Sequence, residues 1–207
     1  MASRLSITVL ISGGGTTLRN LLDLQNRGAL DATIKQVISS RADATGNQYA
    51  VDANIPLVIL PAKQYASAES LSQELFESVR ETGTDLVVAG GFLRRLVIPD
   101  DFENRVINIH PSLIPAFCGK GFYGMRVHES VIQYGCKLSG CTVHFVDNEY
   151  DHGPIIAQRS VEVLPEDSAK GLQQKIFAEE CQLYPDVINQ IAAGRVSVVN
   201  RTVRISD

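Results

Sequence analysis

The sequence lacks the long hydrophobic runs that a membrane-spanning helix requires. None of its apolar stretches approaches the ~18–20 residues that cross a bilayer. The early apolar segment 5–11 runs directly into Gly13-Gly14-Gly15, without an A-x-A-like site for signal-peptide cleavage. We therefore expect a soluble, cytoplasmic protein that does not act at a membrane.

An excess of basic residues is also missing. The 207 residues include 19 Lys and Arg against 23 Asp and Glu, which gives a formal net charge of −4. Proteins that follow the phosphate backbone of a nucleic acid usually carry clustered positive charge. The composition therefore predicts small-molecule substrates and no nucleic-acid partner, and it leaves a monomer and a homodimer equally open.

The four cysteines form neither a C-x-x-C pair nor the dense, even spacing of a secreted disulfide framework. They are Cys118, Cys136, Cys141 and Cys181. We interpret them as structural thiols. The alternative is that Cys118 is a nucleophile in its loop, but no His or Asn is placed by the sequence to activate it.

The chain alternates apolar, β-branched runs with longer segments of helical period, a pattern typical of a parallel sheet covered by helices on both faces. The expected strands are 6–12, 34–39, 57–60, 86–89 and 106–110. The expected helices between them are 17–26, 46–53 and 68–81. The sequence therefore predicts an α/β fold with a doubly wound, Rossmann-like, mostly parallel sheet.

The pattern changes after His110, where prolines and glycines predict a long irregular loop, and loops of this length tend to be functional. A helix over 125–134, extended runs over 141–146 and 155–163, a helix over 168–193 and a hairpin over 196–205 are expected to follow. Pro185 predicts a kink or a break in the last helix. Some of these later strands are expected to be antiparallel to the first set.

The turn after the first expected strand reads Ser12-Gly13-Gly14-Gly15-Thr16-Thr17-Leu18 and leads into a helix. Backbone N–H groups at such a turn form an anion site, with phosphate as the obvious guest. It is not a dinucleotide motif, which needs glycine in place of Leu18, and the G-K-[ST] ending of a P-loop is missing. The alternative is a tight turn that uses glycine for its backbone conformation and binds nothing.

The segment 106–112 (VINIHPS) places polar side chains at the end of an expected strand. Alternate residues share a face, so Asn108 and His110 point one way while Ile107 and Ile109 point the other. Ligands bind at the carboxyl ends of strands in open α/β sheets. Asn can donate to a developing oxyanion and His can move a proton near neutral pH, so the pair predicts a catalytic site. The alternative is two satisfied polar residues at the sheet edge.

A second polar cluster, 147–154 (DNEYDHGP), follows the strand that carries His144. We expect Asp151 to lie near His110, to keep the imidazole protonated and to orient its ring; the alternative is a solvated acidic turn. His144, Asp147, Asp151 and His152 have no standard spacing of metal ligands, so we expect no metal.

These motifs resemble those of the folate-dependent formyltransferase family nearly end to end. The matching segments are 11–18 (ISGGGTTL), 91–94 (GFLR), 107–115 (INIHPSLIP), 140–146 (GCTVHFV), 151–156 (DHGPII) and 180–185 (ECQLYP). The length favours the branch that acts on phosphoribosylglycinamide in purine biosynthesis. The tRNA-formylating members carry an additional carboxy-terminal domain, and the deformylases carry an additional amino-terminal one.

The resemblance implies transfer of a formyl group from 10-formyltetrahydrofolate, the donor substrate, to the primary amine of phosphoribosylglycinamide. Another amine acceptor, such as a sugar nucleotide, is the alternative activity, and a catalytically silent binding module is the alternative class. Asn108 and His110 would stabilise the tetrahedral oxyanion. Asp151 would keep His110 protonated and help to pass the proton from the attacking amine to the leaving folate nitrogen.

The resemblance also implies a set of binding residues within a single domain, 1–207, made of a phosphate-binding half (1–105) and a catalytic and folate-binding half (106–207). Those implied for the phosphoribosylglycinamide are Gly15, Thr16, Thr17, Pro111 and Glu180. Those implied for the folate are Leu93, Arg94, Arg95, Leu96, Asn108, Asp147, Asn148, Glu149 and Tyr150.

Three departures from the family pattern stand out. Thr16-Thr17 replaces the usual Ser-Asn of the glycine turn. A basic residue that often contacts folate falls near Ala68, with Lys63 as the nearest substitute. The segment 119–128 is longer than in shorter members, and Lys120 or Arg126 there is a candidate contact for the substrate phosphate or the folate glutamate, with a solvated lid as the alternative.

Overall fold

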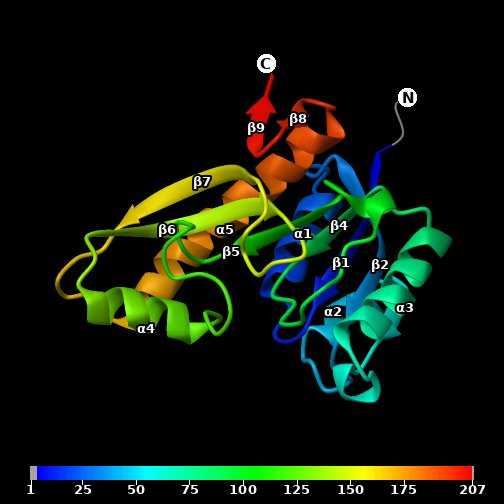
Figure 1. Cartoon of the computed structure of the whole chain (residues 1–207), viewed down its shortest axis with the longest axis horizontal. Helices are drawn as coiled ribbons and strands as arrows, with labels where there is room; N and C mark the ends of the chain where they lie inside the picture. Colours follow the sequence, from blue (N-terminus) through cyan, green and yellow to red (C-terminus); the bar gives the residue numbers. More distant parts are fainter. Residues whose placement is uncertain (1–3, 207) are drawn as a thin grey trace.

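The computed structural model describes residues 4–206, which form a seven-stranded sheet with helices on both faces and a separate hairpin (Figure 1). The strands of the large sheet are β1 (Leu5–Ile11), β2 (Ala32–Ser39), β3 (Leu57–Ile59), β4 (Leu86–Ala89), β5 (Val106–His110), β6 (Leu138–Phe145) and β7 (Ile155–Glu162). The α-helices are α1 (Thr16–Asn26), α2 (Asn47–Asp52), α3 (Ala68–Glu81), α4 (Met125–Tyr134) and α5 (Ala169–Ala192). Two 3₁₀ turns, Ala62–Gln64 and Asp100–Phe102, complete the connections.

The strand order β3-β2-β1-β4-β5-β6-β7 creates a crevice at the centre of the sheet. The chain runs outward from β1 to β3 and then returns to the other side of β1 with β4. Where the strand order reverses in this way, the connections after the two central strands diverge and leave room for a ligand. β1 to β5 are mutually parallel, whereas β6 is antiparallel to β5 and β7 is antiparallel to β6. The predicted fold class is confirmed.

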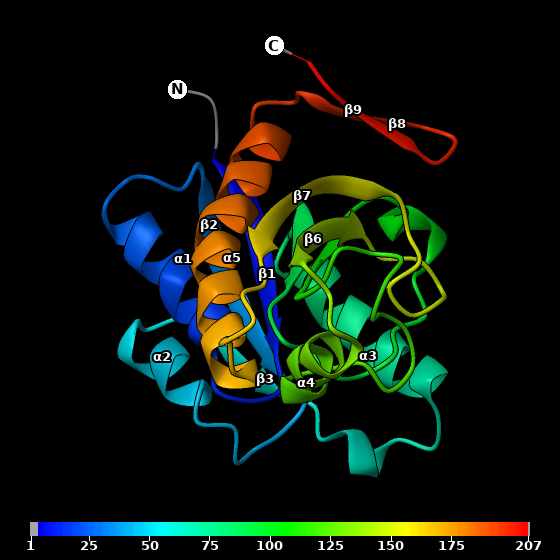
Figure 2. The ribbon, with the colours of Figure 1, turned by 90° about the vertical axis from the view of Figure 1, so that its left-hand side faces the viewer.

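Alternating side chains of β1 serve two separate hydrophobic cores. Ile7, Val9 and Ile11 pack in the core that α1 and α5 cover, whereas Leu10 packs in the core that α3 covers. Figure 2 shows α1, α2 and α5 on one side of the sheet and α3 on the other. Because both faces are buried, the parallel strands are predominantly apolar, which made them visible in the sequence.

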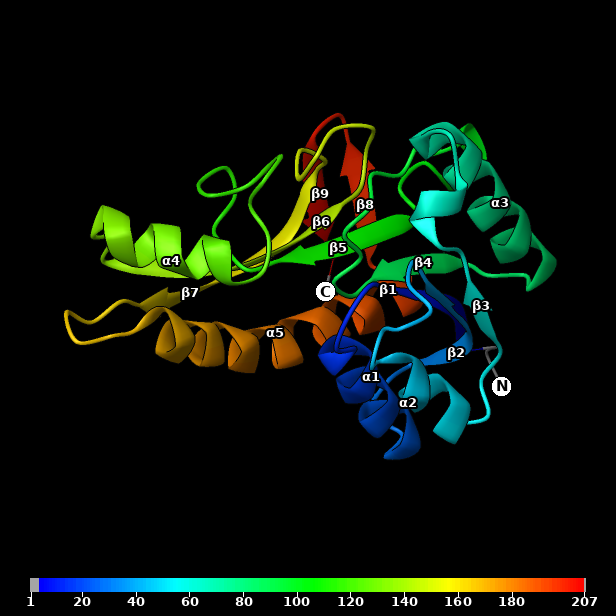
Figure 3. The ribbon, with the colours of Figure 1, turned by 90° about the horizontal axis from the view of Figure 1, so that it is seen from below.

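The helix α5 runs unbroken through Pro185, so of the kink or break predicted there, the break does not occur (Figure 3). Proline has no N–H, so the carbonyl of Cys181, four residues earlier, loses its donor within the helix. The side chain of Asn20 on α1 replaces that donor, with its Nδ2 2.9 Å from the Cys181 oxygen. The neighbouring helix therefore stabilises the proline inside α5.

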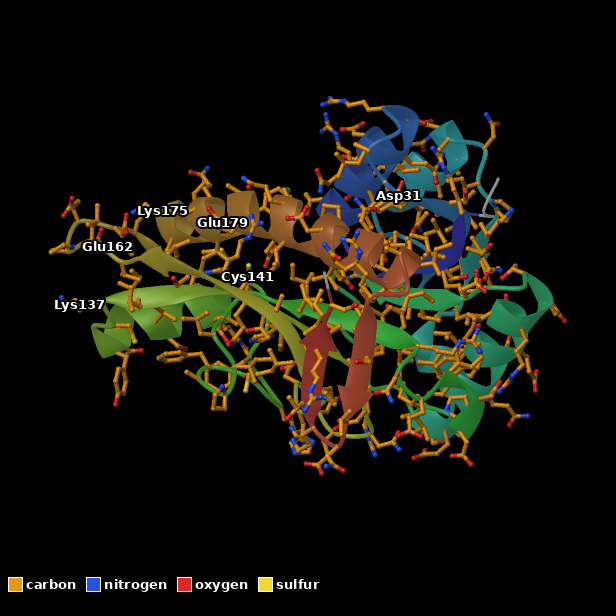
Figure 4. The ribbon with its side chains drawn as sticks, turned by 90° about the horizontal axis from the view of Figure 1, so that it is seen from above. Asp31, Lys137, Cys141, Glu162, Lys175 and Glu179 are labelled. Atoms are coloured by element: carbon orange, nitrogen blue, oxygen red, sulfur yellow. The ribbon has the colours of Figure 1, made fainter. Side chains whose placement is uncertain are left out.

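Strand β6 begins at Leu138, three residues before the expected start at Cys141. Ser139 and Gly140 lie outside the extended run that the sequence predicted, yet both are buried and pair with β7 at Val161 and Ser160. Gly140 is required by close packing, because an added Cβ would lie 2.0 Å from the backbone oxygen of Arg159. Figure 4 shows the next residue, Cys141, between β6 and the α5 residues Lys175 and Glu179.

Replacing Gly140 with Ala is expected to lower the free energy of unfolding by about 1–3 kcal/mol, because β7 must move to admit the methyl group. Chemical denaturation measures the change. Ser139→Ala is the matched control on the same strand: the Ser139 hydroxyl is buried without a hydrogen-bond partner, so its removal is expected to leave stability unchanged or slightly higher. Equal stability of G140A and wild type would show that the two strands separate without strain.

The hairpin β8 (Val196–Val199) and β9 (Thr202–Ile205) follows α5, as predicted, and β9 contacts β7 without joining the large sheet.

Among residues 4–206, no helix is long and apolar enough to cross a membrane.

Candidate active site

A cavity of about 640 Å³ lies at the carboxyl ends of β1, β4 and β5, where the strand order reverses. It gathers residues from both halves of the chain. The predicted site residues that line it are Gly15, Thr16, Thr17, Leu93, Arg94, Arg95, Leu96, Asn108, His110, Pro111, Asp147, Glu149, Tyr150, Asp151 and Glu180. Asn148 does not line it: its Oδ1 accepts a hydrogen bond from the backbone N–H of Ile98 at 2.9 Å and so ties the 147–151 loop to the segment after β4.

The glycine turn presents an open helix terminus to this cavity. Gly15 is the N-cap of α1 with φ 66°, and no side chain caps the first N–H groups of the helix. A Cβ on Gly15 would also lie 2.7 Å from the Cα of Gly46, so this glycine is needed both for its conformation and for close approach. The uncapped N–H groups at the positive end of the helix dipole can bind an anion.

Ser12, at the end of β1, connects this turn to the segment after β4. Its hydroxyl lies 2.7 Å from that of Ser40 and accepts a hydrogen bond from the N–H of Leu93 at 2.9 Å. Thr17 packs beneath Gly90, where a side chain at Gly90 would approach within 3.1 Å of the Thr17 Cβ. The two walls of the crevice are therefore fixed to each other.

Asn108 is oriented by His144, a residue that the sequence suggested only as a poorly spaced metal ligand. The two residues face each other across β5 and β6, with Asn108 Nδ2 3.2 Å from His144 Nε2. His144 Nδ1 lies 2.8 Å from the carbonyl of Phe145 and must donate to it, so Nε2 accepts the amide proton. Burial lowers the pKa of His144, which keeps the ring neutral and suited to this role.

His110 lies between a carbonyl and a carboxylate. Its Nε2 is 2.9 Å from the carbonyl of Phe117 and must donate to it, while its Nδ1 is 3.5 Å from Asp151 Oδ2. Nδ1 therefore faces the carboxylate, and Asp151 does lie beside His110, as the sequence predicted.

Asp151 is held in an uncommon backbone conformation with φ 51°. Its Oδ2 accepts a hydrogen bond from the N–H of Gly119 at 2.8 Å, and its Oδ1 lies 3.8 Å from His144 Nε2. Few residues with a Cβ adopt this region, and Asp is one of those that do. The carboxylate thus contacts both histidines and the long loop after β5.

That loop, residues 111–124, forms one wall of the cavity. The hydroxyl of Ser112 donates to the carbonyl of Ala116 at 2.6 Å, which helps to hold the Phe117 carbonyl against His110. Neither Lys120 nor Arg126 lines the cavity, and the Arg126 guanidinium lies over the Tyr123 ring at 5.2 Å. The loop contributes backbone and aromatic groups rather than a cation.

Lys63 and Ala68 are likewise absent from the cavity wall. Lys63 belongs to the 3₁₀ turn Ala62–Gln64, before α3. Among the described residues that line the cavity, the permanent cations are Arg94 and Arg95. Cys118 does not gain nucleophilic character, because burial and the charge of Asp151 raise its thiol pKa.

His128 is a cavity residue that the sequence analysis missed. It lies on the first turns of α4, is 3% exposed, and its Nδ1 has no hydrogen-bond partner. Burial, together with the nearby His110, lowers the pKa of His128 to about 4, so this ring stays neutral. Only the three-dimensional position of α4 reveals it, because a histidine within a helical pattern carries no signal of its own.

Glu180 points a carboxylate into the cavity from α5. Burial raises its pKa to about 7, and among residues 4–206 no cation lies within ion-pair distance. An unpaired carboxylate in a partly buried position is destabilising unless a cationic ligand neutralises it. Within the same residues, no group of three or more His, Cys, Asp or Glu side chains is arranged to hold a metal ion.

Glu180→Gln is expected to raise the melting temperature at pH 8 but not at pH 4. Glu180 has a raised pKa, so the folded state keeps a proton between pH 4.5 and about 7 that the unfolded state releases, and stability falls as pH rises through this window. The cost above pH 7 is at most about 3 kcal/mol, and partial contact with solvent reduces it.

Thermal unfolding of the two proteins at both pH values measures this effect. Glu179→Gln is the matched control on the same helix: Glu179 is paired with Arg159 at 3.5 Å, so its removal should give no gain at pH 8. A lower melting temperature of E180Q at pH 8 would show that Glu180 is already neutralised within the protein.

Comparison with known proteins gives a uniform result. The family model described as formyl transferase matches residues 5–188. A chloroplastic phosphoribosylglycinamide formyltransferase from Vigna unguiculata is 38% identical over 198 residues, covering 93% of this chain and 62% of that protein. The phosphoribosylglycinamide formyltransferase of Escherichia coli is 34% identical over 196 residues, covering 94% of this chain and 90% of that protein. The chain thus spans less than two thirds of the Vigna relative's length.

Solved structures agree with these relatives. Glycinamide ribonucleotide transformylase 1 from Symbiobacterium toebii superposes with a TM-score of 0.92 at 39% identity, covering 100% of this chain and 96% of that one. Phosphoribosylglycinamide formyltransferase from Coxiella burnetii superposes with a TM-score of 0.87 at 35% identity, covering 97% and 93%.

Proposed function

This chain belongs to the formyl transferase family, and from that membership we propose that it transfers the formyl group of 10-formyltetrahydrofolate to the amine of 5-phosphoribosylglycinamide, a step of purine biosynthesis. One observation carries the proposal: Asn108, His110, Asp151 and Glu180 face the same cavity as the uncapped terminus of α1. The cavity therefore offers backbone N–H groups for a phosphate, the Glu180 carboxylate for an amine, and Asn108 and His110 as donors for a formyl oxygen.

The acceptor substrate binds between the glycine turn and α5. Its phosphate accepts hydrogen bonds from the N–H groups of Gly15, Thr16 and Thr17 at the start of α1. Its amine end lies toward Glu180, whose carboxylate is otherwise unpaired. The amine is neutral when it attacks, and one of its N–H groups donates a hydrogen bond to the Glu180 carboxylate, which reduces the cost of burying that charge.

The folate donor occupies the other side of the cavity. Residues 93–96 and the loop 147–151 enclose the pterin, and Arg94 and Arg95 supply positive charge for the glutamate carboxylates. These residues come from both halves of the chain, so we propose a single catalytic domain in which 1–105 contributes the phosphate site and part of the folate site, and 106–207 contributes the catalytic groups. We further propose that the protein acts in the cytoplasm, as a monomer or homodimer.

The chemistry begins when the amine nitrogen attacks the formyl carbon, and the formyl oxygen gains negative charge. A free N–H of Asn108 and the imidazolium of His110 stabilise this oxyanion; loss of one such donor typically costs about 2.7–4 kcal/mol of barrier. His144 fixes the amide of Asn108 in the donating orientation. Because these groups are already held in place, they need little reorganisation as the charge develops.

Collapse of the tetrahedral intermediate requires one proton transfer. The attacking nitrogen loses a proton, the bond from the formyl carbon to folate N10 breaks, and N10 gains a proton as the carbonyl forms again. Asp151 stabilises the charge on His110 and accepts the amine proton, directly or through water, before it reaches N10. Its contact with Gly119 keeps the carboxylate at the correct place.

The direct test is incubation of the purified protein with both substrates, which is expected to yield formylated glycinamide ribonucleotide and tetrahydrofolate in equal amounts. A sugar nucleotide amine serves as the control acceptor and is expected to be a poor substrate. Absence of turnover with both substrates saturating would contradict the proposal.

A further inference from the structure

The hairpin β8–β9 lies outside residues 5–188, the part that matches the family model, yet it contacts the cavity loop. Arg201 stands at its tip, where Asn200 turns the chain with φ 56°. Both terminal nitrogens of its guanidinium contact His152: Nη2 donates to the His152 carbonyl, and Nη1 lies 3.3 Å from His152 Nε2. The hairpin is thus attached to the residue that follows Asp151.

The contact continues into the cavity through the side chain of His152. Arginine can only donate, so His152 Nε2 accepts and its Nδ1 donates to Asp147 Oδ2 at 2.7 Å. The other oxygen of Asp147 accepts the backbone N–H of Glu149 at 2.9 Å. One chain of hydrogen bonds therefore connects Arg201 with the backbone of the loop that lines the cavity.

Asn148 also anchors the loop, since its Oδ1 accepts the N–H of Ile98 at 2.9 Å and its backbone carbonyl accepts from Arg95 at 3.4 Å, but both contacts lie three residues before Asp151. Asp151 adopts a left-handed conformation, which Asp tolerates better than most residues with a Cβ, and its carboxylate is held by Gly119 on the opposite wall. Gly153 fixes the end of the loop, since a Cβ there would lie 1.9 Å from the Phe145 carbonyl oxygen. Between these points, Arg201 holds the peptide of His152 from the outside.

We propose that Arg201 is a positioning residue, through which the β8–β9 hairpin holds the 147–152 loop in the conformation that binds the folate donor and presents Asp151. The part concerning the folate rests on the proposed function. The acceptor side, built from the glycine turn and Glu180, has no contact with the hairpin among the hydrogen bonds of residues 4–206.

Arg201→Ala in the full chain is expected to raise the KM for 10-formyltetrahydrofolate by about 2- to 5-fold, the range for loss of a solvent-exposed charged contact. The KM for phosphoribosylglycinamide should not change. Arg201→Lys, which keeps a donor for the His152 carbonyl, should recover part of the loss. Arg204→Ala is the matched control, because Arg204 is exposed on the same hairpin and its side chain makes no hydrogen bond or ion pair within residues 4–206.

Hydrogen exchange followed by mass spectrometry tests the loop without reference to catalysis. In R201A, amides of 147–152 should exchange about 2- to 5-fold faster than in wild type, while amides of 13–19 should be unaffected. A general loss of stability would accelerate both segments and shift both KM values, and that result would overturn the proposal.

The two hypotheses fail in different ways. If wild type does not turn over but amides of 147–152 exchange faster in R201A, the assigned reaction is wrong and the positioning role of Arg201 in this loop is retained. If wild type turns over and R201A equals R204A in both KM values and in the rates of amide hydrogen exchange, Arg201 does not position the loop and the assigned reaction is retained.

Discussion

His110→Ala is expected to reduce kcat by about 10³-fold or more, while the Kd of each substrate changes little. The imidazolium interacts with charge that exists only after the amine has attacked, so its loss affects the transition state far more than the bound ground state. Backbone groups pair His110 with Thr142 across β5 and β6, so removal of the side chain leaves the sheet pairing in place.

Steady-state turnover combined with calorimetric titration of each substrate measures the two parts of this prediction. His152→Ala is the control for loss of an imidazole near the site: it removes a side chain from the hydrogen bonds to Arg201 and Asp147, and a reduction of no more than about 5-fold is expected. Equal kcat values for H110A and wild type would remove His110 from the mechanism.

The large sheet and its helices could be predicted because each element is marked by residues within it or next to it in the sequence. The strand Val106–His110 and the helix Ala68–Glu81 have the bounds that the sequence predicted, since each is marked by a run of apolar residues and by a capping or breaking residue at its ends. Ser67, for example, caps α3 by accepting a hydrogen bond from Ser70 N. Signals of this kind need no knowledge of the rest of the chain.

The features that the sequence misjudged, such as the start of β6, or left open, such as the effect of Pro185, depend on partners far away along the chain. Gly140 belongs to β6 because β7 covers it, and α5 continues through Pro185 because Asn20 supplies the missing donor. Neither partner can be identified from neighbouring residues. Both departures are therefore effects of tertiary packing that overrides local preference.

The residues of the candidate site likewise fall into two groups, those that the local sequence indicates and those that only the tertiary structure shows. Asn108 and His110 stand out because they are polar residues at the end of an apolar strand, and Asp151 stands out beside a Gly-Pro turn. The partner of Asn108, His144, follows only from the register of an antiparallel pair that the sequence does not specify. Arg201 lies further still, on an exposed hairpin where a basic residue is unremarkable until its contact with His152 is seen.

Asp151→Asn is expected to reduce kcat by about 10²- to 10⁴-fold, a loss comparable to that of His110→Ala. The amide can still accept the N–H of Gly119, so the loop should keep its shape, but it carries no charge to balance an imidazolium 3.5 Å away. With the amide oxygen in the place of Oδ2, on Gly119 and facing His110, the NH₂ group takes the place of Oδ1 and faces His144. A neutral amide cannot take a proton from the attacking amine.

The comparison with a carboxylate elsewhere isolates this effect. Asp43→Asn removes an exposed partner of Arg41, and no change in kcat is expected. If D151N retains the kcat of wild type, the proton must leave the attacking amine by a route that avoids Asp151, and water in the cavity becomes the base. If D151N and H110A each lose activity and the double variant loses no more than either, the two side chains act as one unit, as their contact at Nδ1 implies.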